Sequence, residues 1–394
     1  MTLLNPAVER SMGRSSWIRR MFEIARKLKA EVGEANVCDF SLGNPHLEPP
    51  GEVIDELKRL AASKEPGLHK YMTTAGVPEV RQRIADHIGR REGVPFKSEH
   101  IVMTCGAAGA INVAMRTLLG TGDKVALFTP CFAEYRFYCL HAGAQPVFVP
   151  TDETFDLDAD QLAKALMPDV RMVILNSPNN PTGRVYPERS VQAVCDVLKK
   201  KSHEFGRPIV LLVDDPYRKI TYDGVKVPNV FAKYPFTMMA TSFSKDLGLA
   251  GERIGYLAIH PEFPQFADVL EGLCFCLRTL GFVNAPATMQ RVAAASLDAS
   301  VDVGAYQRNR DRLLSGLREI GYECVTPEGA FFIFPKAPGG DDLAFNNKLI
   351  AERILCVPGV GFETPGFFRL SYAVDPDVVE RSMEGFKRAF LAAR

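Results

Sequence analysis

Short apolar runs alternate with longer amphipathic stretches over the middle of the chain, from about residue 100 to residue 260. The apolar runs have the length of strands and lie at residues 101–104, 124–128, 146–149, 172–175, 209–213 and 238–241. Stretches of helical length separate most of them, including residues 107–119, 132–141, 158–166 and 188–200. This alternation predicts an α/β fold in which helices cover a mostly parallel sheet. Residues 254–259 are a further candidate strand, which could run antiparallel to its neighbours.

The pattern changes on both sides of this middle region. Ahead of it, residues 6–29, 52–62 and 78–91 have the spacing of amphipathic helices. Behind it, we expect a long helical region at 286–320, short strands at 322–325, 331–334 and 368–372, and a closing helix at 377–391. The pattern therefore predicts a large domain at residues 49–285 and a smaller α+β domain at residues 286–394, which residues 1–48 help to complete.

Small and polar residues follow four of the predicted strands directly. The segment Cys105 to Ala108 comes after the strand at 101–104, and residues 176–183 come after the strand at 172–175. Residues 214–217 and 242–245 follow the strands at 209–213 and 238–241. Because ligands of parallel sheets bind beyond the carboxyl ends of the strands, we expect all four segments to share one edge and one site.

The groups in these segments suit a phosphate-bearing ligand with a ring nitrogen. Gly106, Ala107 and Ala108 at a helix start can present backbone N–H groups to a phosphate. Ser242 and Arg253 can add a hydroxyl and a bidentate guanidinium. The carboxylate of Asp214 can pair with a protonated ring nitrogen, and Tyr217 offers a hydroxyl three residues later. The amine of Lys245 becomes a nucleophile if its surroundings lower its pKa.

Each of these features is more often structural when it stands alone. A helix start made of small residues usually serves tight packing, and Asn-Pro-Thr-Gly is usually a turn. An aspartate three residues before a tyrosine is commonly a helix cap with a packed aromatic. A lone lysine is mostly a solvated surface charge. Together, in this order and at these strand ends, they favour a binding site over four unrelated structural features.

Composition excludes several classes of function. The chain has 394 residues with 47 basic and 47 acidic side chains, so no overall charge favours nucleic acid or an anionic membrane. Its nine cysteines are scattered, and Cys274 and Cys276 are too isolated for a zinc site, so we expect reduced thiols and no metal. No apolar stretch suits a signal peptide or a membrane span. We therefore expect a cytoplasmic protein.

Four motifs give the chain a likeness to a known family over nearly its whole length. Residues 242–256 resemble the lysine signature of the class I/II aminotransferases, which are fold type I pyridoxal-phosphate (PLP) enzymes. Arg253 stands eight residues after Lys245, where the family keeps a phosphate-binding arginine. Residues 180–183, 214–217 and 368–372 match at the family's spacing. The resemblance implies a PLP-dependent transaminase, with a large domain built on a mostly parallel sheet and a smaller α+β domain.

The resemblance also assigns roles to individual cofactor-binding residues. Lys245 would hold PLP as an internal aldimine and carry the proton between Cα and C4′. Asp214 would keep the pyridine nitrogen protonated, and Asn180 and Tyr217 would contact the ring oxygen O3′. Phe132 would stack on the ring. The residues expected to hold the phosphate are Gly106, Ala107, Ala108, Ser242 and Arg253.

Substrate and partner contacts follow from the same resemblance. Arg369 would bind the α-carboxylate of the amino acid or 2-oxo acid, assisted by Asn180 and the backbone at Gly43. Tyr71 matches a tyrosine that such enzymes lend to the phosphate of the partner subunit, which implies a homodimer with a shared site. Ala108 and Leu280 stand where two aspartate-specific branches have a cation, although Arg278 is close. These departures favour a substrate other than aspartate alone.

Two other classes of function are open on the same residues. The scaffold could serve a PLP-dependent lyase that eliminates a β or γ substituent. It could also be a binding module without activity, as in transcription factors that carry an aminotransferase-like domain. Those factors have a DNA-binding domain ahead of it, whereas here the likeness begins almost at the first residue and the net charge is zero. We therefore expect an aminotransferase that moves the amino group of an L-amino acid to a 2-oxo acid.

Overall fold

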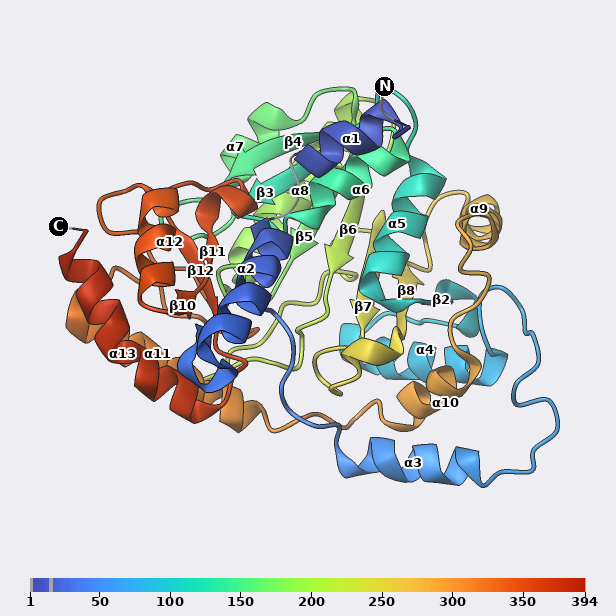
Figure 1. The fold of residues 1–394 in the computed structure, drawn as a ribbon. Coiled ribbons are helices and arrows are strands. Elements are labelled where there is room, and N and C mark those ends of the chain that lie inside the picture. The colour runs from blue at the N-terminus through green and yellow to red at the C-terminus, as the bar shows by residue number, and fades with distance from the viewer. Residues whose placement is uncertain (1–2, 14–16, 394) are drawn as a thin grey trace.

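A computed structural model describes residues 3–13 and 17–393, with a seven-stranded sheet at its centre (Figure 1). The strand order is β2-β8-β7-β6-β5-β3-β4. Pairing is parallel from β7 through β6, β5 and β3 to β4, whereas β8 is antiparallel to both its neighbours. The expected mostly parallel sheet is confirmed. Its strands are β2 (Ile101–Thr104), β3 (Lys124–Thr129), β4 (Gln145–Pro150), β5 (Val170–Asn176), β6 (Val210–Asp214), β7 (Thr237–Ser242) and β8 (Gly255–Ile259).

Helices cover both faces of this sheet. Along β6, Leu211 and Val213 share a core with α4, α8 and α10, while Val210 and Leu212 share another with α5, α6 and α9. Strands buried on both faces read as continuous apolar runs, and the sequence identifies them for this reason. The helices of this larger part are α3 (Gly51–Ala61), α4 (Pro78–Glu92), α5 (Gly106–Leu118), α6 (Glu134–Ala142), α7 (Ala159–Ala165), α8 (Glu188–Glu204), α9 (Phe266–Thr279) and α10 (Ala287–Ala295).

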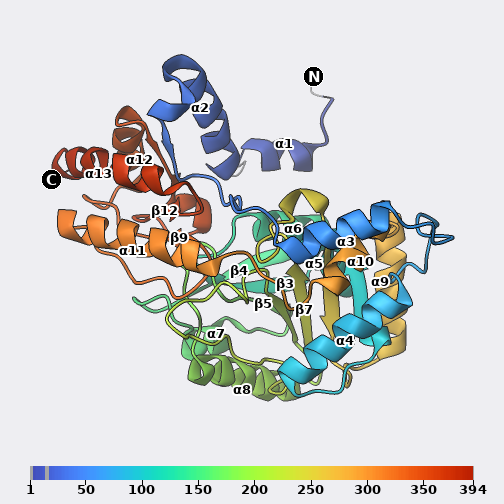
Figure 2. The ribbon, with the colours of Figure 1, turned by 90° about the horizontal axis from the view of Figure 1, so that it is seen from below.

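Both ends of the chain contribute to a smaller part beside the sheet, where α2 lies near α12 and α13 (Figure 2). Met21 and Ala25 of α2 share a core with Phe334, Leu355 and Val357, and β1 pairs in parallel with β10. A separate antiparallel sheet has the order β11-β12-β9. The elements of this smaller part are α2 (Trp17–Val32), β1 (Cys38–Asp39), α11 (Val303–Ile320), β9 (Phe332–Ile333), α12 (Asp342–Ala351), β10 (Ile354–Leu355), β11 (Val357–Pro358), β12 (Phe368–Ser371) and α13 (Pro376–Leu391). Helix α1 (Pro6–Gly13) precedes them in the chain.

The expected helical region at 286–320 is wrong as a single element, because α10 and α11 are separate helices. The backbone between them bonds to the larger part instead of to a helical neighbour. Lys219 Nζ donates to the carbonyls of Leu297 and Ala299 at 2.6 and 2.8 Å, and the N–H of Val301 donates to the carbonyl of Asp246 at 2.8 Å. The connection between the two helices is therefore fixed on the residue next to Lys245.

One other expectation differs from the structure. Residues 322–325 are not a strand, because their carbonyls accept single bonds from separate donors: Lys336 N–H donates to Glu323, and the Arg318 guanidinium donates to Cys324.

The expected helix at 6–29 corresponds, within the described residues, to α1 and α2, and its residues 14–16 lie outside them.

Helix α10 lies directly after the expected domain boundary, which falls between residues 285 and 286. Met289, Val292 and Ala293 of this helix belong to the core that also holds residues of α3 and α4. The expected boundary would therefore separate α10 from the helices on which it packs. We propose to place the boundary between α10 and α11, within residues 296–302, with residues 17–39 packed on the smaller part.

Candidate active site

The four strand-end segments meet at one cavity of about 310 Å³. This volume is at the lower end of the range for pockets that bind small molecules. Its walls come from the carboxyl ends of β5, β6 and β7, from the start of α5, and from the smaller part through β9 and β12. The cavity is lined by Gly43, Ala107, Ala108, Ile111, Phe132, Tyr138, Asn176, Asn180, Asp214, Pro216, Tyr217, Ser242, Ser244, Lys245, Ala250, Arg253, Phe332 and Arg369.

Lys245 follows β7 and reaches into this cavity with its amine. Its Nζ donates a hydrogen bond to the carbonyl of Gly43 at 2.8 Å and lies 5.5 Å from the centre of the Phe331 ring. Burial, together with the nearby cations Arg369 and Arg253, lowers the pKa of Lys245 to about 8. An ordinary lysine has a pKa near 10.4. A substantial fraction of this amine is therefore neutral, and so nucleophilic, close to neutral pH.

Asp214 ends β6 and presents one carboxylate oxygen without a partner. The Tyr135 hydroxyl donates to Oδ2, whereas no described residue donates to Oδ1, although that atom is buried. Burial raises the pKa of Asp214 to about 7, the bond from Tyr135 opposes this rise, and the charge of Asp215 adds to it. A buried carboxylate oxygen without a donor is costly. A protonated nitrogen placed in the cavity would satisfy Oδ1 and favour the ionised carboxylate.

Arg369 of β12 is a fully buried cation that contacts neutral groups. Its Nη1 donates to Oδ1 of Asn180 at 3.0 Å and its Nη2 to the carbonyl of Ser41 at 2.7 Å. The guanidinium lies 4.6 Å from the centre of the Phe332 ring. Burial lowers the pKa of Arg369 to about 10, which leaves it charged at neutral pH. A buried charge whose described hydrogen-bond partners are neutral is well placed to bind an anion that enters the cavity.

Asn180 and Tyr217 stand between these charged groups. The backbone N–H of Asn180 donates to Oδ1 of Asn176 at 2.8 Å, which fixes the start of its loop. Burial raises the pKa of Tyr217, and the charge of Asp214 raises it further, while a hydrogen bond with Asn180 opposes both. The tyrosine therefore keeps its proton and can donate it in a hydrogen bond to a ligand oxygen.

The opposite end of the cavity is suited to a phosphate. Cys105, the N-cap of α5, gives no side-chain hydrogen bond to the first turn of that helix, at which Ala107 and Ala108 line the cavity. A Cβ on Gly106, whose φ is +73°, would lie 2.8 Å from Nη2 of Arg253. The guanidinium of Arg253 is exposed at this end. Helix start, glycine and arginine together form a cradle for an anion.

Of the expected site residues, all but two line this cavity. Gly106 lies directly behind the lining, against Arg253. Tyr71 lies on the segment between α3 and α4, is 91% exposed, and is not among the described residues that line the cavity. The structure of one chain therefore brings the expected cofactor and substrate residues together but leaves Tyr71 apart from them.

Sequence reasoning missed three residues that hold the side chains of the site in place. Tyr135, which holds Asp214, stands three residues after Phe132, and in the helix expected at residues 132–141 that spacing was a usable signal. In the structure α6 begins only at Glu134, but the two rings are still in contact, with their centres 5.5 Å apart. Phe331 and Phe332, which lie against Lys245 and Arg369, come from the start of β9 and the residue before it, in the smaller part. Nothing in the sequence near them pointed to the cavity.

Comparisons with known proteins agree over almost the entire chain. The family model described as aminotransferase class I and II matches residues 35–386. A probable aspartate aminotransferase of Methanocaldococcus jannaschii is 28% identical over 95% of this chain and 97% of its own. An aromatic-amino-acid aminotransferase of Thermococcus litoralis is 29% identical over 95% of both. The crystal structure of an aminotransferase from Eubacterium rectale is 39% identical over 100% of both chains, with a TM-score of 0.96.

Proposed function

The chain belongs to the class I and II aminotransferases, and on this premise we propose how its residues divide the work of the reaction. The enzyme is a transaminase that depends on PLP. When bound, PLP supplies an aldehyde that takes up the amino group and a ring that accepts the electrons left on Cα. The observation that carries the proposed roles is the meeting of the Lys245 amine, the unpartnered Oδ1 of Asp214 and the buried Arg369 in one cavity.

The cavity fits this cofactor at both of its ends. The unpartnered Oδ1 of Asp214 would receive the ring N–H, and the close approach of Gly106 to Arg253 would leave room for a phosphate. Phe132 would lie against the ring. The remaining contacts are proposed for Asn180 and Tyr217 at the ring oxygen, and for Ala107, Ala108 and Ser242 at the phosphate.

Lys245 is proposed to attach the cofactor and then to act as the base. Its lowered pKa supports both roles, because only a neutral Nζ can form the covalent bond or accept the proton of Cα. Asp214 is proposed to hold a proton on the ring nitrogen, for which its carboxylate must be ionised. Tyr217 is proposed to keep its own proton and donate a hydrogen bond to the ring oxygen, in agreement with its raised pKa.

Arg369 is proposed to bind the α-carboxylate of the substrate. It is the fully buried guanidinium of the cavity lining, the partners described for it are neutral oxygens, and its planar fork suits a carboxylate. The backbone at Gly43 and the side chain of Asn180 lie beside it in the lining. Donor amino acid and acceptor 2-oxo acid share this carboxylate, so one contact serves both halves of the transfer.

We propose that the preferred amino donor has an uncharged side chain. In the described lining the cationic side chains are Lys245, Arg253 and Arg369, and each already has a role. Ile111, Phe132, Tyr138 and Phe332 add apolar surface instead. A second carboxylate would thus enter the cavity without a cation of this chain to receive it.

A single-turnover screen of the PLP-loaded enzyme against common L-amino acids tests this choice. The cofactor absorbance should change most efficiently with neutral and aromatic amino acids. With aspartate, kcat/KM should be roughly 10- to 100-fold lower, because an unpaired carboxylate is costly. If aspartate is the best donor, the proposal fails.

In that case, the variant Arg278→Ala shows whether this exposed arginine of α9 supplies the cation for the second carboxylate. Pyruvate or sulfide released without an acceptor would instead indicate a lyase.

We propose that the working assembly is a homodimer whose sites are shared. Tyr71 is almost fully exposed, and Val8 and Met12 on α1 are exposed apolar side chains, as expected of surfaces that a second copy would cover. The guanidinium of Arg253 is also exposed at the phosphate end of the cavity. A tyrosine hydroxyl from the partner would complete the phosphate contacts at that end.

Tyr71→Phe tests the shared site. Loss of a hydrogen bond to a charged phosphate should weaken PLP binding roughly 10- to 100-fold. Titration of the apoenzyme with PLP measures this change. Mixed subunits of Lys245→Ala and Tyr71→Phe should regain one site with wild-type affinity, because one site of each heterodimer has both groups intact. A mixture that only adds the two parent activities after proven subunit exchange would exclude a role for Tyr71 across the interface.

We also propose that the protein works in the cytoplasm. All nine cysteines are free, which suits a reducing compartment. None of the helices among residues 3–13 and 17–393 is long and apolar enough to cross a membrane.

A further inference from the structure

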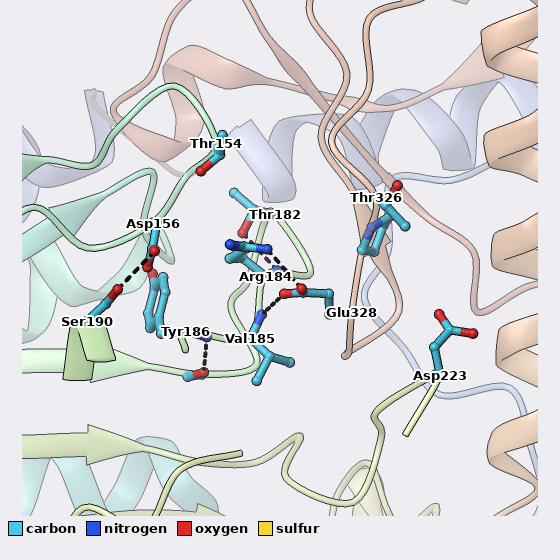
Figure 3. A network of polar contacts seen from close by, with 12 residues as sticks. Thr154, Asp156, Thr182, Arg184, Val185, Tyr186, Ser190, Asp223, Thr326 and Glu328 are labelled. Carbon is cyan, nitrogen blue, oxygen red and sulfur yellow. Dashed lines mark hydrogen bonds and ion pairs between the residues drawn. The ribbon is translucent and has the colours of Figure 1, made fainter. Parts of the chain in front are cut away.

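A short segment of the smaller part, residues 327–330 ahead of β9, is fastened to the larger part by Glu328 (Figure 3). One oxygen of its carboxylate pairs with Nη1 of Arg184 at 2.9 Å, and the other accepts the backbone N–H of Val185 at 3.1 Å. The side chains of Glu328 and Arg184 are 28% and 18% exposed, so the pair is partly shielded from water. Pairs of this kind are stronger than those on an open surface.

The backbone of the same segment holds the same loop. The N–H groups of Glu328 and Gly329 both donate to the carbonyl of Gly183, at 2.8 and 2.9 Å. Gly183 has a φ of +71°, and a Cβ at this position would lie 2.5 Å from Cβ of Pro327. The loop at Gly183 and the segment at residues 327–330 are therefore in close contact, which restricts the movement of one relative to the other.

The loop that Glu328 grips carries Asn180. It is closed by two backbone bonds, from Asn179 to the carbonyl of Arg184 at 2.8 Å and from Gly183 to the carbonyl of Asn179 at 2.9 Å. The hydroxyl of Thr182 also donates to Oδ1 of Asn179 at 2.8 Å. A loop bonded to itself in this way moves as a unit, so its position at residues 183–185 sets the position of Asn180.

Both the loop that carries Asn180 and the segment at residues 327–330 lead to a contact with Arg369. The side chain of Asn180 accepts a hydrogen bond from the guanidinium at 3.0 Å. On the other side, Phe332 follows the fastened segment and its ring centre lies 4.6 Å from the guanidinium. Glu328 thus joins the two elements between which Arg369 is held.

We propose that Glu328 is a positioning residue for the substrate carboxylate: its carboxylate, paired with Arg184, sets the Asn180 loop against the smaller part so that Arg369 keeps the orientation that receives the substrate. The inference rests on the proposed role of Arg369. A contact across two separately packed parts can shift binding of a ligand that touches neither partner of the pair.

Glu328→Gln tests this role, because it removes the charge and keeps the shape. Asp223→Asn is the matched control. Asp223 pairs with Arg310 at 2.6 Å across the same boundary, and Arg310 also donates to the carbonyl of Pro327 at 3.0 Å. This control therefore bears on the same segment, but from another loop than the one that carries Asn180. The probe is 3-phenylpropionate, a carboxylate without an amino group, titrated into the PLP-loaded enzyme and followed by calorimetry. Kinetics of the amino-acid half-reaction, PLP affinity of the apoenzyme and thermal unfolding are measured on each variant.

Glu328→Gln should weaken binding of the probe and raise KM by roughly 3- to 30-fold. The kcat and the PLP affinity should fall less than this, because Asn180 is one of several residues proposed to contact the cofactor and the others are left in place. Arg184→Gln should reproduce this loss, and the double variant should add little to either single one, because the two side chains act as a pair. Asp223→Asn should leave the probe's affinity unchanged. Should Glu328→Gln fail to fold, Arg184→Gln alone carries the comparison.

Arg369→Lys separates this inference from the proposed function. If Arg369→Lys weakens the probe and neither Glu328→Gln nor Arg184→Gln does, the positioning role is wrong and the carboxylate role stands. If Arg369→Lys leaves the affinity unchanged, the proposed carboxylate site itself is wrong. Equal losses in Glu328→Gln and Asp223→Asn would reduce Glu328 to a general contact of the boundary and overturn the inference.

Discussion

Replacing Lys245 by alanine should reduce transamination by more than about 10⁴-fold, the upper range for a single acid–base group. The expected loss exceeds that of an ordinary base because one amine has two roles, attachment of the cofactor and transfer of the Cα proton. Lys245 makes a single hydrogen bond, at 2.8 Å, to the uncharged carbonyl of Gly43, so the fold should survive the change. Single-turnover absorbance measures the activity, and circular dichroism checks the fold.

Borohydride reduction followed by peptide mass spectrometry supplies the decisive control. The wild-type protein should retain the cofactor on the peptide that contains Lys245, and the alanine variant should retain none after dialysis. In wild-type apoenzyme, the rate of cofactor attachment should rise with pH, reach half its limit near pH 8 and level off above it, because the neutral amine forms as pH passes the lowered pKa. Covalent cofactor on another lysine of the variant would refute the assignment.

Asp214→Asn should lower turnover by about 10⁴-fold, the upper end for one acid–base group, while the shape of the site is kept. The amide cannot hold a proton on a ring nitrogen, so the electrons left on Cα lose their acceptor. PLP binding should weaken less, by roughly 10- to 100-fold, the value of one hydrogen bond to a charged group. Turnover and cofactor titration are measured on the same preparation.

Tyr135→Phe is the graded comparison for Asp214→Asn. The hydroxyl of Tyr135 lowers the pKa of Asp214 against the effect of burial, so its loss should raise that pKa above about 7. The ionised carboxylate would then be lost at a higher pH, and the acidic limb of the turnover profile should move upward while the plateau stays near wild type. Near-normal turnover of Asp214→Asn at every pH would leave Asp214 only a structural role.

The sequence predicted the parts of this molecule whose causes are local. The central strands are buried on both faces, so they read as apolar runs. Asp214 ends one of them, and Asn180 and Lys245 come shortly after two others. Their gathering at one edge then follows from parallel pairing. The resemblance added roles for these residues that no pattern of polar and apolar positions contains.

Contacts made across the chain could not be predicted in this way. Glu328 meets Arg184 over 144 positions, and Arg369 meets Asn180 over 189, so no local pattern records either pair. The break between α10 and α11 depends on Lys219, which takes the carbonyls of a segment far along the chain. Residues 322–325 had the apolar spacing of a strand, but among residues 3–13 and 17–393 no strand pairs with them.

The order in which the chain supplies the cavity has a consequence for synthesis on the ribosome. The residues proposed to hold the cofactor within one subunit lie between Gly106 and Arg253, all in the part with the central sheet. The proposed carboxylate end needs Ser41 near the start and Arg369 near the finish. Because domains tend to fold as they emerge, N-terminal part first, a nascent chain can complete its cofactor end before its substrate end exists. Truncated chains that stop before β12 would then still bind PLP while recognising no amino acid.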